Sequence, residues 1–331
     1  MSNLRLSILD QSPISEGSSL GDALRNTIDL AQFADGLGYV RYWVAEHHGT
    51  KSFACASPEV LLGSIAAVTS RLRIGSGGIM LPHYSPFKVA ETFTMLSGLY
   101  PGRIDLGIGR SIGRDQKVAL ALQRDRRQLP PDDFPEQLDE LLSYFSANPS
   151  SPFEIPELWL LGSSEESAVW AAERSLPYVV ADFINPDGAR LAHRYQQEFR
   201  SSARAALPQT GVALCAVCAE TDAEAERLCD SFRMMKTALF LDRSIPVPPL
   251  ERAQRFLAEG GPFAVQARSG RRMITGTPER VCRLIQTVAE EYDAEEVFIV
   301  NVMHNHAARR RSYELLAEAF AKSSSCPSAS G

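Results

Sequence analysis

Two adjacent histidines follow a strand-like run early in the chain. The run YVRYWVA at residues 39–45 leads directly into Glu46, His47 and His48. Histidine can donate, accept or transfer a proton near neutral pH, so either ring is a candidate for acid–base chemistry, and a structural role is equally open. Successive side chains of an extended chain point to opposite faces, so only one of these rings can face a given pocket. The two faces hold Trp43, Ala45 and His47 on one side and Val44, Glu46 and His48 on the other.

Serine residues mark a second candidate site. The strand-like run LWLLG ends at Gly162, and a predicted helix then begins with Ser163, Ser164 and Ser167. Free N–H groups and the helix dipole make such a terminus an anion site, and the hydroxyls can add donors. A plain helix cap needs only one serine, so capping and phosphate binding are both open from this stretch alone. Arg110, at the end of the preceding strand, favours phosphate because a guanidinium matches phosphate oxygens bidentately.

Three further motifs are weaker indications of chemistry. The run GIGRSIG at residues 107–113 resembles a dinucleotide-binding glycine loop only in part, because its spacing differs and it follows a fourth strand. His304 and His306 form an H-x-H pair without a clear third ligand. Cys215 and Cys218 lie three apart on a predicted strand, so their side chains face opposite sides. We therefore predict neither a metal site nor a nicotinamide site.

The hydrophobic pattern predicts alternating strands and helices that would position these residues. Eight strands are predicted at residues 4–10, 39–45, 72–81, 102–109, 158–162, 177–183, 211–220 and 295–303. Helices are predicted at residues 20–37, 57–70, 85–102, 135–146, 163–175 and 187–205, from 222 onward, and at 277–292 and 307–321. Repeated strand–helix units predict an α/β fold, with a (β/α)8 TIM barrel as the leading architecture and an open doubly wound sheet as the alternative.

In such a barrel, functional side chains lie at the carboxyl ends of the strands and in the loops that follow. That rule selects Asp10, Gln11, Glu46, His47, His48, Gly77, Gly78, Arg110, Ser163, Ser164, Asp182, His304, Asn305 and His306. Two stretches, 123–157 and 237–276, break the strand–helix rhythm, and long loops in a compact domain are usually functional or disordered. One barrel domain is expected over residues 1–322, and the small polar tail at 323–331 is expected to be disordered.

The composition argues against several classes of protein. The 331 residues are 44% hydrophobic and 22% charged with a net charge of −6, which argues against a nucleic-acid-binding or anionic-membrane surface. No apolar run approaches the ~18–20 residues of a membrane helix, and the N-terminus lacks a signal-peptide pattern. Six cysteines are few enough to be reduced thiols, so a cytoplasmic protein is expected. The arginine run at 309–311 is interpreted as a solvated helix face.

Five segments, in order along the chain, carry a resemblance to a known family: AEHHGT, RLRIGSGGIMLPHYSP, PGRIDLGIGR, LWLLGSSEESA and GTPERV. Over about residues 4–320 the chain resembles the bacterial luciferase-like flavin monooxygenases, in particular their single-chain oxidoreductase branch. The resemblance implies a (β/α)8 barrel that uses reduced FMN or, in one branch, a reduced deazaflavin. The leading implied function is a monooxygenase that oxygenates a small organic substrate with reduced FMN and O2, through a flavin hydroperoxide. A deazaflavin-dependent oxidoreductase and a non-catalytic flavin-binding protein are the alternatives.

The resemblance also assigns roles to individual residues. The first histidine of the E-H-H motif is the catalytic one, which is His47, and its face of the strand would then turn inward. The phosphate of FMN is expected at Arg110 and at the residues that follow the fifth strand. These are Gly162, Ser163, Ser164 and Ser167. A small pair that family members often join by a cis peptide under the flavin ring falls on Gly77 and Gly78.

The chain departs from the family pattern in two places, and the resemblance also implies partners for the protein. The light-emitting subunit of the family has Cys where this chain has Gly109, which weakens the case for a true luciferase. The link at 147–157 is short beside many relatives, and 258–275 corresponds to a region that family members use as a mobile lid. With no nicotinamide site predicted, FMN is expected as a cosubstrate reduced by a separate NAD(P)H flavin reductase. A homodimer is expected, with O2 and a small organic substrate as the other partners.

Overall fold

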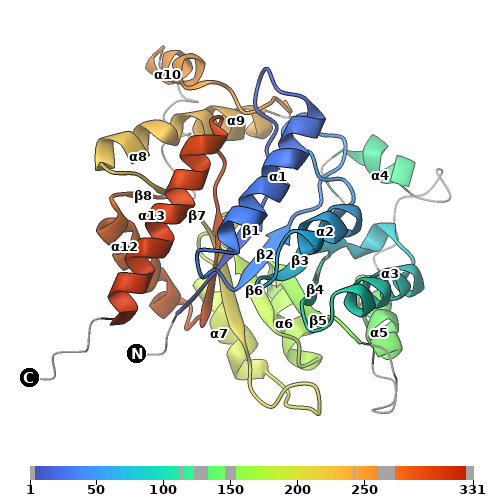
Figure 1. Cartoon of the computed structure of the whole chain (residues 1–331). Coiled ribbons are helices and arrows are strands. Elements are labelled where there is room, and N and C mark those ends of the chain that lie inside the picture. The colour runs from blue at the N-terminus through green and yellow to red at the C-terminus, as the bar shows by residue number, and fades with distance from the viewer. Residues whose placement is uncertain are drawn as a thin grey trace, which may run out of the picture.

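Parallel strands form one continuous sheet that closes into a barrel (Figure 1). The computed structural model describes residues 4–111, 113, 115–122, 133–145, 154–241, 243–259 and 273–325. In that part of the chain the strands are β1 Arg5–Asp10, β2 Arg41–Val44, β3 Arg73–Met80, β4 Ile104–Gly109, β5 Glu157–Gly162, β6 Tyr178–Ala181, β7 Thr210–Cys218, β8 Met273–Gly276 and β9 Glu296–Val300. Strands β1 to β6 pair in order, β6 pairs with β7, and β9 pairs with both β7 and β1. This closure confirms the predicted TIM barrel and excludes the open doubly wound sheet.

The short strand β8 stands outside the closed ring. It pairs with β7 from Cys215 to Cys218, where β7 continues past the end of β9. The sequence pattern did not predict β8, because its four residues follow a stretch without hydrophobic periodicity. The eight strands that were predicted are the ones that close the barrel.

Helices cover the outside of the barrel. They are α1 Leu20–Ala34, α2 Pro58–Ala67, α3 Pro86–Leu99, α4 Gln116–Leu122, α5 Phe134–Phe145, α6 Glu165–Glu173, α7 Ala189–Glu198, α8 Asp222–Leu228, α9 Asp230–Phe240, α10 Leu250–Ala258, α12 Pro278–Glu291 and α13 His306–Ser325, with a 3-10 turn η1 Leu81–His83. Ser19 closes a capping box on α1, and proline occupies the first turn of α2, α3 and α12. Figure 1 shows α9 and α10 at the end of the barrel where the loop after β1 lies. None of the helices described here is long and apolar enough to cross a bilayer.

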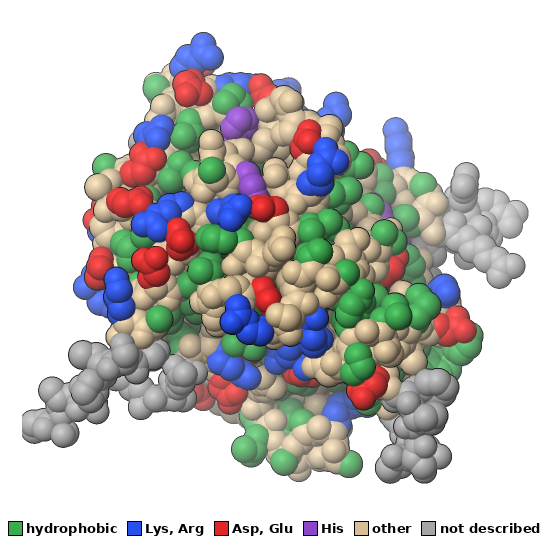
Figure 2. Space-filling view, viewed as in Figure 1, with side chains coloured by type: hydrophobic (Ala, Val, Ile, Leu, Met, Phe, Trp, Pro, Cys, Tyr) green, Lys and Arg blue, Asp and Glu red, His purple; other side chains and the backbone are tan. Residues whose placement is uncertain are grey.

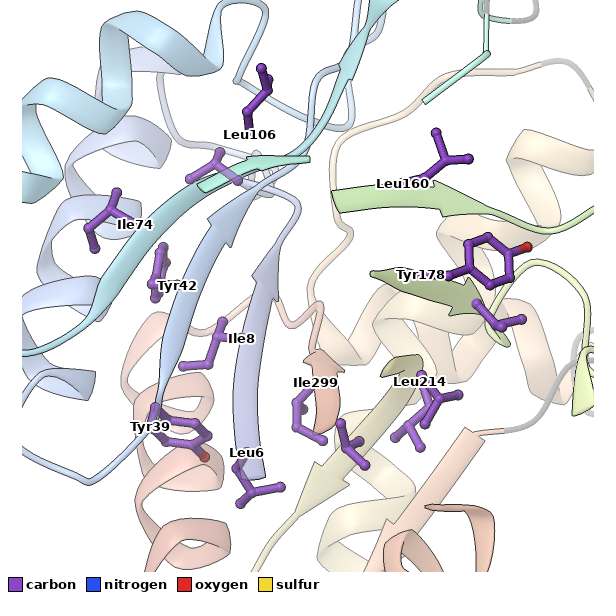
Figure 3. Close-up of a cluster of buried hydrophobic side chains, with 14 of the residues drawn as sticks. Leu6, Ile8, Tyr39, Tyr42, Ile74, Leu106, Leu160, Tyr178, Leu214 and Ile299 are labelled. Atoms are coloured by element: carbon purple, nitrogen blue, oxygen red, sulfur yellow. The ribbon is translucent and has the colours of Figure 1, made fainter. Parts of the chain in front are cut away.

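One hydrophobic cluster fills the barrel interior, and another lies between the strands and the surrounding helices. The outer cluster, between strands and helices, includes Leu6, Ile8, Tyr42, Ile74, Leu106, Leu160, Tyr178, Leu214 and Ile299 (Figure 3). The interior cluster comprises Leu9, Trp43, Ala45, Trp159, Val179, Ala213, Cys215, Met235, Val247, Phe298, Val300 and Val302. Alternate residues of a strand enter opposite clusters, as a period of two requires. The Trp43 ring centroid lies 4.4 Å from that of Phe298 and 5.4 Å from that of Trp159, so aromatic rings fill the middle of the barrel.

A buried ionic network fills the amino-terminal end of the barrel. Arg41 donates to Asp105 at 2.8 Å, to Glu157 at 3.0 Å and to Glu296 at 3.1 Å. Trp43 adds a hydrogen bond from its Nε1 to Asp105 at 2.8 Å. Because the network plugs this end, a ligand has to enter from the carboxyl ends of the strands, as in other TIM barrels.

The interpretation of the run 309–311 as a solvated face is wrong for its first residue. Arg309 is 1% exposed, and its guanidinium donates to the Asp10 carboxylate and to the carbonyl oxygen of Asn301. The hydroxyl of Tyr42 also donates to Asp10. Asp10 is therefore one half of a buried ion pair between β1 and α13, on the helix side of the strand.

Candidate active site

His47 follows β2 on the interior side of the barrel. Trp43 and Ala45 belong to the interior cluster, which confirms that their face of the strand is the inward one. The backbone N–H of His47 donates to the carbonyl oxygen of Cys55 at 2.8 Å, which fixes the loop after β2. The imidazole packs against Phe53, with 4.4 Å between the ring centroids. The side chain thus lies at the mouth of the barrel, and its catalytic role remains a prediction.

Burial determines the protonation state of this imidazole. Burial lowers the pKa of His47 to about 4, with the Glu46 carboxylate opposing the effect and His48 adding to it. The ring is therefore neutral near pH 7 and can donate or accept a hydrogen bond without carrying charge. Its Nδ1 is buried and no described group reaches it with hydrogen-bond geometry; the Ala45 backbone has only a minor effect on the pKa. Buried nitrogens without a partner are uncommon in folded proteins.

Glu46 and His48 lie on the opposite face and bind each other. Glu46 Oε1 lies 2.6 Å from His48 Nε2 and accepts a 2.5 Å hydrogen bond from the Tyr84 hydroxyl, while Oε2 accepts from the backbone N–H of Met80 at 2.9 Å. Burial raises the pKa of Tyr84, and the Glu46 carboxylate raises it further. Glu46 therefore connects the loop after β2 to the segment after β3. Strand parity predicted the shared face of Glu46 and His48, but gave no sign of Met80 or Tyr84 as partners.

A surface without side chains lies at the end of β3. The peptide bond between Gly77 and Gly78 is cis. A Cβ added at Gly78 would lie 2.8 Å from the carbonyl oxygen of Gly107, and one at Gly77 would collide with Leu9. Only glycine fits at these two positions, because Leu9 and the backbone of Gly107 already occupy the space that a Cβ would take.

The predicted phosphate residues meet where α6 begins. Arg110 is exposed after β4, and its guanidinium carbon lies 5.1 Å from the Trp170 ring centroid on α6. The pKa of Glu166, in the first turn, is lowered mainly by a hydrogen bond with Ser164 and in part by the charge of Arg110. Ser163 and Ser164 are half-buried at the same terminus, and Ser164 is the N-cap of α6. Arginine and serine donors from two neighbouring strands thus lie around one helix start.

Ser167 and Gly162 take part in the packing and capping at the start of α6. Ser167 is buried, and its Oγ donates to the Ser164 carbonyl oxygen at 2.7 Å and lies 2.8 Å from the Tyr178 hydroxyl. A Cβ added at Gly162 would collide with the Ser167 side chain. Gly162 therefore lets α6 start close to the end of β5, and the Ser167 hydroxyl is engaged in the capping box of that helix.

The weaker motifs do not converge on one site. His304 Nε2 lies 3.1 Å from a backbone carbonyl of the loop after β1, whereas His306 Nε2 lies 2.7 Å from Asp29. Cys215 belongs to the interior cluster and Cys218 to the outer one, as their spacing predicts. In the part of the chain that the structure describes, no three His, Cys, Asp or Glu side chains are grouped as metal ligands would be.

Helix α9 covers part of the barrel mouth. Met235 and Val247 belong to the interior cluster, and Phe232 packs against it. Most of the predicted lid, 260–272, and most of the short link, 146–153, lie outside the described residues. The sequence predicted helix from residue 222 onward, but not that α9 would cover the mouth, because the strand–helix rhythm is broken over 237–276.

Comparisons with known proteins agree with this geometry. A family model described as luciferase-like monooxygenase matches residues 4–295. A luciferase-like monooxygenase of Escherichia coli (strain K12) is 37% identical, with 94% of this chain and 96% of that protein covered. An N-acetyl-S-alkylcysteine monooxygenase of Bacillus subtilis (strain 168) is 38% identical, with 96% of this chain and 98% of that protein covered. The crystal structure of apo-MsnO8 superimposes with a TM-score of 0.89 at 38% identity, covering 96% of this chain and 98% of that chain. The chain therefore belongs to the luciferase-like monooxygenase family.

Proposed function

We propose that the protein is a monooxygenase that uses reduced FMN and O2 to oxygenate a small organic substrate. The observation that carries the proposal is the grouping of three features at one end of the barrel. These are the neutral imidazole of His47, the side-chain-free surface at Gly77–Gly78, and Arg110 beside the start of α6. Membership of the family supports a monooxygenase, and the residues present support a flavin mononucleotide.

The donors at α6 fit a single phosphate group. The free N–H groups of the first turn, the Ser163 and Ser164 hydroxyls and the Arg110 guanidinium would bind its oxygens. Ser167 would contribute by holding Ser164 in place through their capping box. From that terminus, beside β4 and β5, a planar ring would extend across β3 over Gly77 and Gly78.

The remaining residues would shape the reaction. Reduced flavin bound here would supply the oxygen-activating chemistry. His47 would present its unpartnered Nδ1 to a reacting group without adding charge, and Glu46 would fix the loop that carries it. Helix α9, packed into the interior cluster through Met235, would help to exclude water from the mouth.

We also propose that reduced FMN arrives from a separate NAD(P)H-dependent flavin reductase. Arg110 and the two half-buried hydroxyls of Ser163 and Ser164 suit a mononucleotide, since Arg190 and Arg194 at the same helix start are already paired with Glu165. A purified protein that uses flavin as a cosubstrate would be nearly colourless and would not oxidise NADH by itself.

A homodimer through α2 and α3 is part of the proposal. Val60 on α2 is 71% exposed, and Met95 and Leu99 on α3 are 63% and 64% exposed. Figure 2 shows hydrophobic side chains gathered on the face that these helices form. Exposed apolar side chains in a contiguous patch mark an interaction surface, and most soluble oligomers pair identical patches.

Oxygen consumption tests the proposed function. The protein would be mixed with a flavin reductase, NADH, FMN and a panel of small organic compounds that includes thioethers. Substrate-dependent formation of an oxygenated product, with the oxygen atom derived from O2, is the expected result. Product formation only with a reduced deazaflavin and without O2 uptake would instead support the deazaflavin-dependent oxidoreductase. Flavin binding with no turnover of any compound would support the non-catalytic alternative.

A further inference from the structure

Gln11, directly after β1, carries an amide nitrogen that bonds to none of the described residues. Its side chain is 6% exposed, and its Nε2 is buried without a hydrogen bond among the described residues. The preceding Asp10 points to the helix side, where Tyr42 and Arg309 bind it. Because consecutive side chains of an extended chain alternate, Gln11 points to the barrel interior, as Leu9 does.

The backbone around Gln11 is bonded to both ends of the loop that carries His47. The N–H of Ala45 donates to the Asp10 carbonyl oxygen at 2.9 Å, and the N–H of Ala54 donates to the Ser12 carbonyl oxygen at 2.8 Å. Strands β1 and β2 are neighbours in the barrel. Gln11 and His47 therefore reach the same mouth from adjacent strands.

Gln11 Nε2 and His47 Nδ1 are both buried on this side of the mouth, and neither has a hydrogen bond of regular geometry among the described residues, although the Ala45 backbone lies near the His47 ring. A buried polar group without a partner costs free energy, and native proteins contain few of them. Two of them from adjacent strands indicate groups that a ligand satisfies. An amide N–H donor suits an acceptor such as a carbonyl oxygen.

We infer that Gln11 is a flavin-binding residue whose Nε2 donates to a carbonyl oxygen of the isoalloxazine ring. The inference rests on the proposed function. The phosphate would lie beside β4 and β5 and the ring over Gly77–Gly78 on β3, so the far edge of the ring would approach β2 and β1. We place the pyrimidine ring on that side, because it carries the two carbonyl groups of the ring system that an amide can bind.

Variants of Gln11 separate ligand binding from a structural role. Gln11→Leu removes the donor at similar volume, and Gln11→Glu replaces the amide by a carboxylate that repels a carbonyl oxygen. Anaerobic titration with reduced FMN should show a roughly 2- to 13-fold weaker affinity for Gln11→Leu, as for the loss of one neutral hydrogen bond, and a larger loss for Gln11→Glu. In the flavin-free protein, the melting temperature of Gln11→Leu should equal or exceed that of the parent, because a buried unpaired amide has been removed.

A matched control comes from Ser97 on α3, whose buried Oγ also lacks a partner but lies in the helix layer. Ser97→Ala should leave the affinity for reduced FMN unchanged. The inference is overturned if Gln11→Leu binds reduced FMN as the parent does, or if it lowers the melting temperature of the flavin-free protein. If Gln11→Leu does not fold, Gln11→Met takes its place with the same expectations. If the parent itself fails to bind reduced FMN, the result counts against the proposed function. That outcome differs from an unchanged affinity or a lowered melting temperature of Gln11→Leu, which count against the role of Gln11.

Discussion

Replacing His47 should change how the stability of the folded protein depends on pH. The pKa of the His47 imidazole is about 4 in the folded chain, against 6.5 for an unperturbed histidine, and burial is the main cause. Below about pH 6.5 the unfolded chain therefore binds a proton that the folded chain excludes. The contribution of His47 to stability is fully present above about pH 6.5 and is lost as the pH falls toward about 4.

The difference between the two pKa values determines the size of the effect. A span from 6.5 to about 4, at about 1.4 kcal/mol per pH unit, gives about 3 kcal/mol as the largest loss of unfolding free energy. The ring retains some exposure, although its Nδ1 is enclosed, so the measured loss should lie below that limit. His47→Phe keeps a ring against Phe53 and removes the titration.

Urea unfolding of the parent and of His47→Phe, between about pH 7 and about pH 4.5, measures the effect. The free energy of unfolding of the parent relative to the variant should fall as the pH is lowered through this window. His193→Phe, at an exposed position on α7, serves as the control and should leave the pH dependence unchanged. A difference between parent and His47→Phe that stays constant, or that grows in favour of the parent on acidification, would refute the assigned burial and the neutral imidazole.

Three further substitutions test other parts of the molecule. Arg41→Met removes the buried cation that Asp105 and Glu296 share, although Arg73 and Arg5 remain as partners, and should lower the free energy of unfolding in urea by about 3–5 kcal/mol; a loss below about 1 kcal/mol would show that the network is not tightly coupled. Gly78→Ala places a methyl group 2.8 Å from a carbonyl oxygen and should weaken reduced-FMN binding, whereas Gly63→Ala, whose nearest atom would be 4.0 Å away, should not. Met95→Lys should convert the expected dimer to a monomer in analytical ultracentrifugation, and Leu207→Lys, at a 78% exposed position away from α2 and α3, should have no such effect; a dimer that survives Met95→Lys would place the interface elsewhere.

Local sequence pattern was sufficient to predict the barrel, and pattern together with the resemblance predicted the orientation of His47. Strand–helix alternation predicted the eight strands that close, since each unit carries its own periodicity. Strand parity offered two faces for the histidines, and the resemblance selected the one that the structure places inside, beside Trp43 and Ala45. The cis peptide at Gly77–Gly78 was expected from the resemblance alone, because nothing in a pair of glycines specifies it.

Contacts between segments that are distant along the chain could not be predicted from the sequence pattern. Glu46 is bonded to groups 34 and 38 residues away, and Arg309 pairs with Asp10 across 299 residues, so the local pattern showed neither. An arginine inside a charged run looks solvated until its partner is known. Gln11 was a candidate only by its position after a strand, and the absence of a protein partner became visible once its neighbours were in place.

Anaerobic titration of the flavin-free protein with reduced FMN tests the central claim most directly. We expect saturable binding that is tighter for reduced than for oxidised FMN. We also expect a roughly 10- to 150-fold weaker affinity for Arg110→Ala, which removes a charged hydrogen bond to the phosphate. Arg25→Ala, at an exposed position on α1, should leave the affinity unchanged. Equal affinity of the parent and Arg110→Ala, or binding of a reduced deazaflavin but not of reduced FMN, would contradict the account.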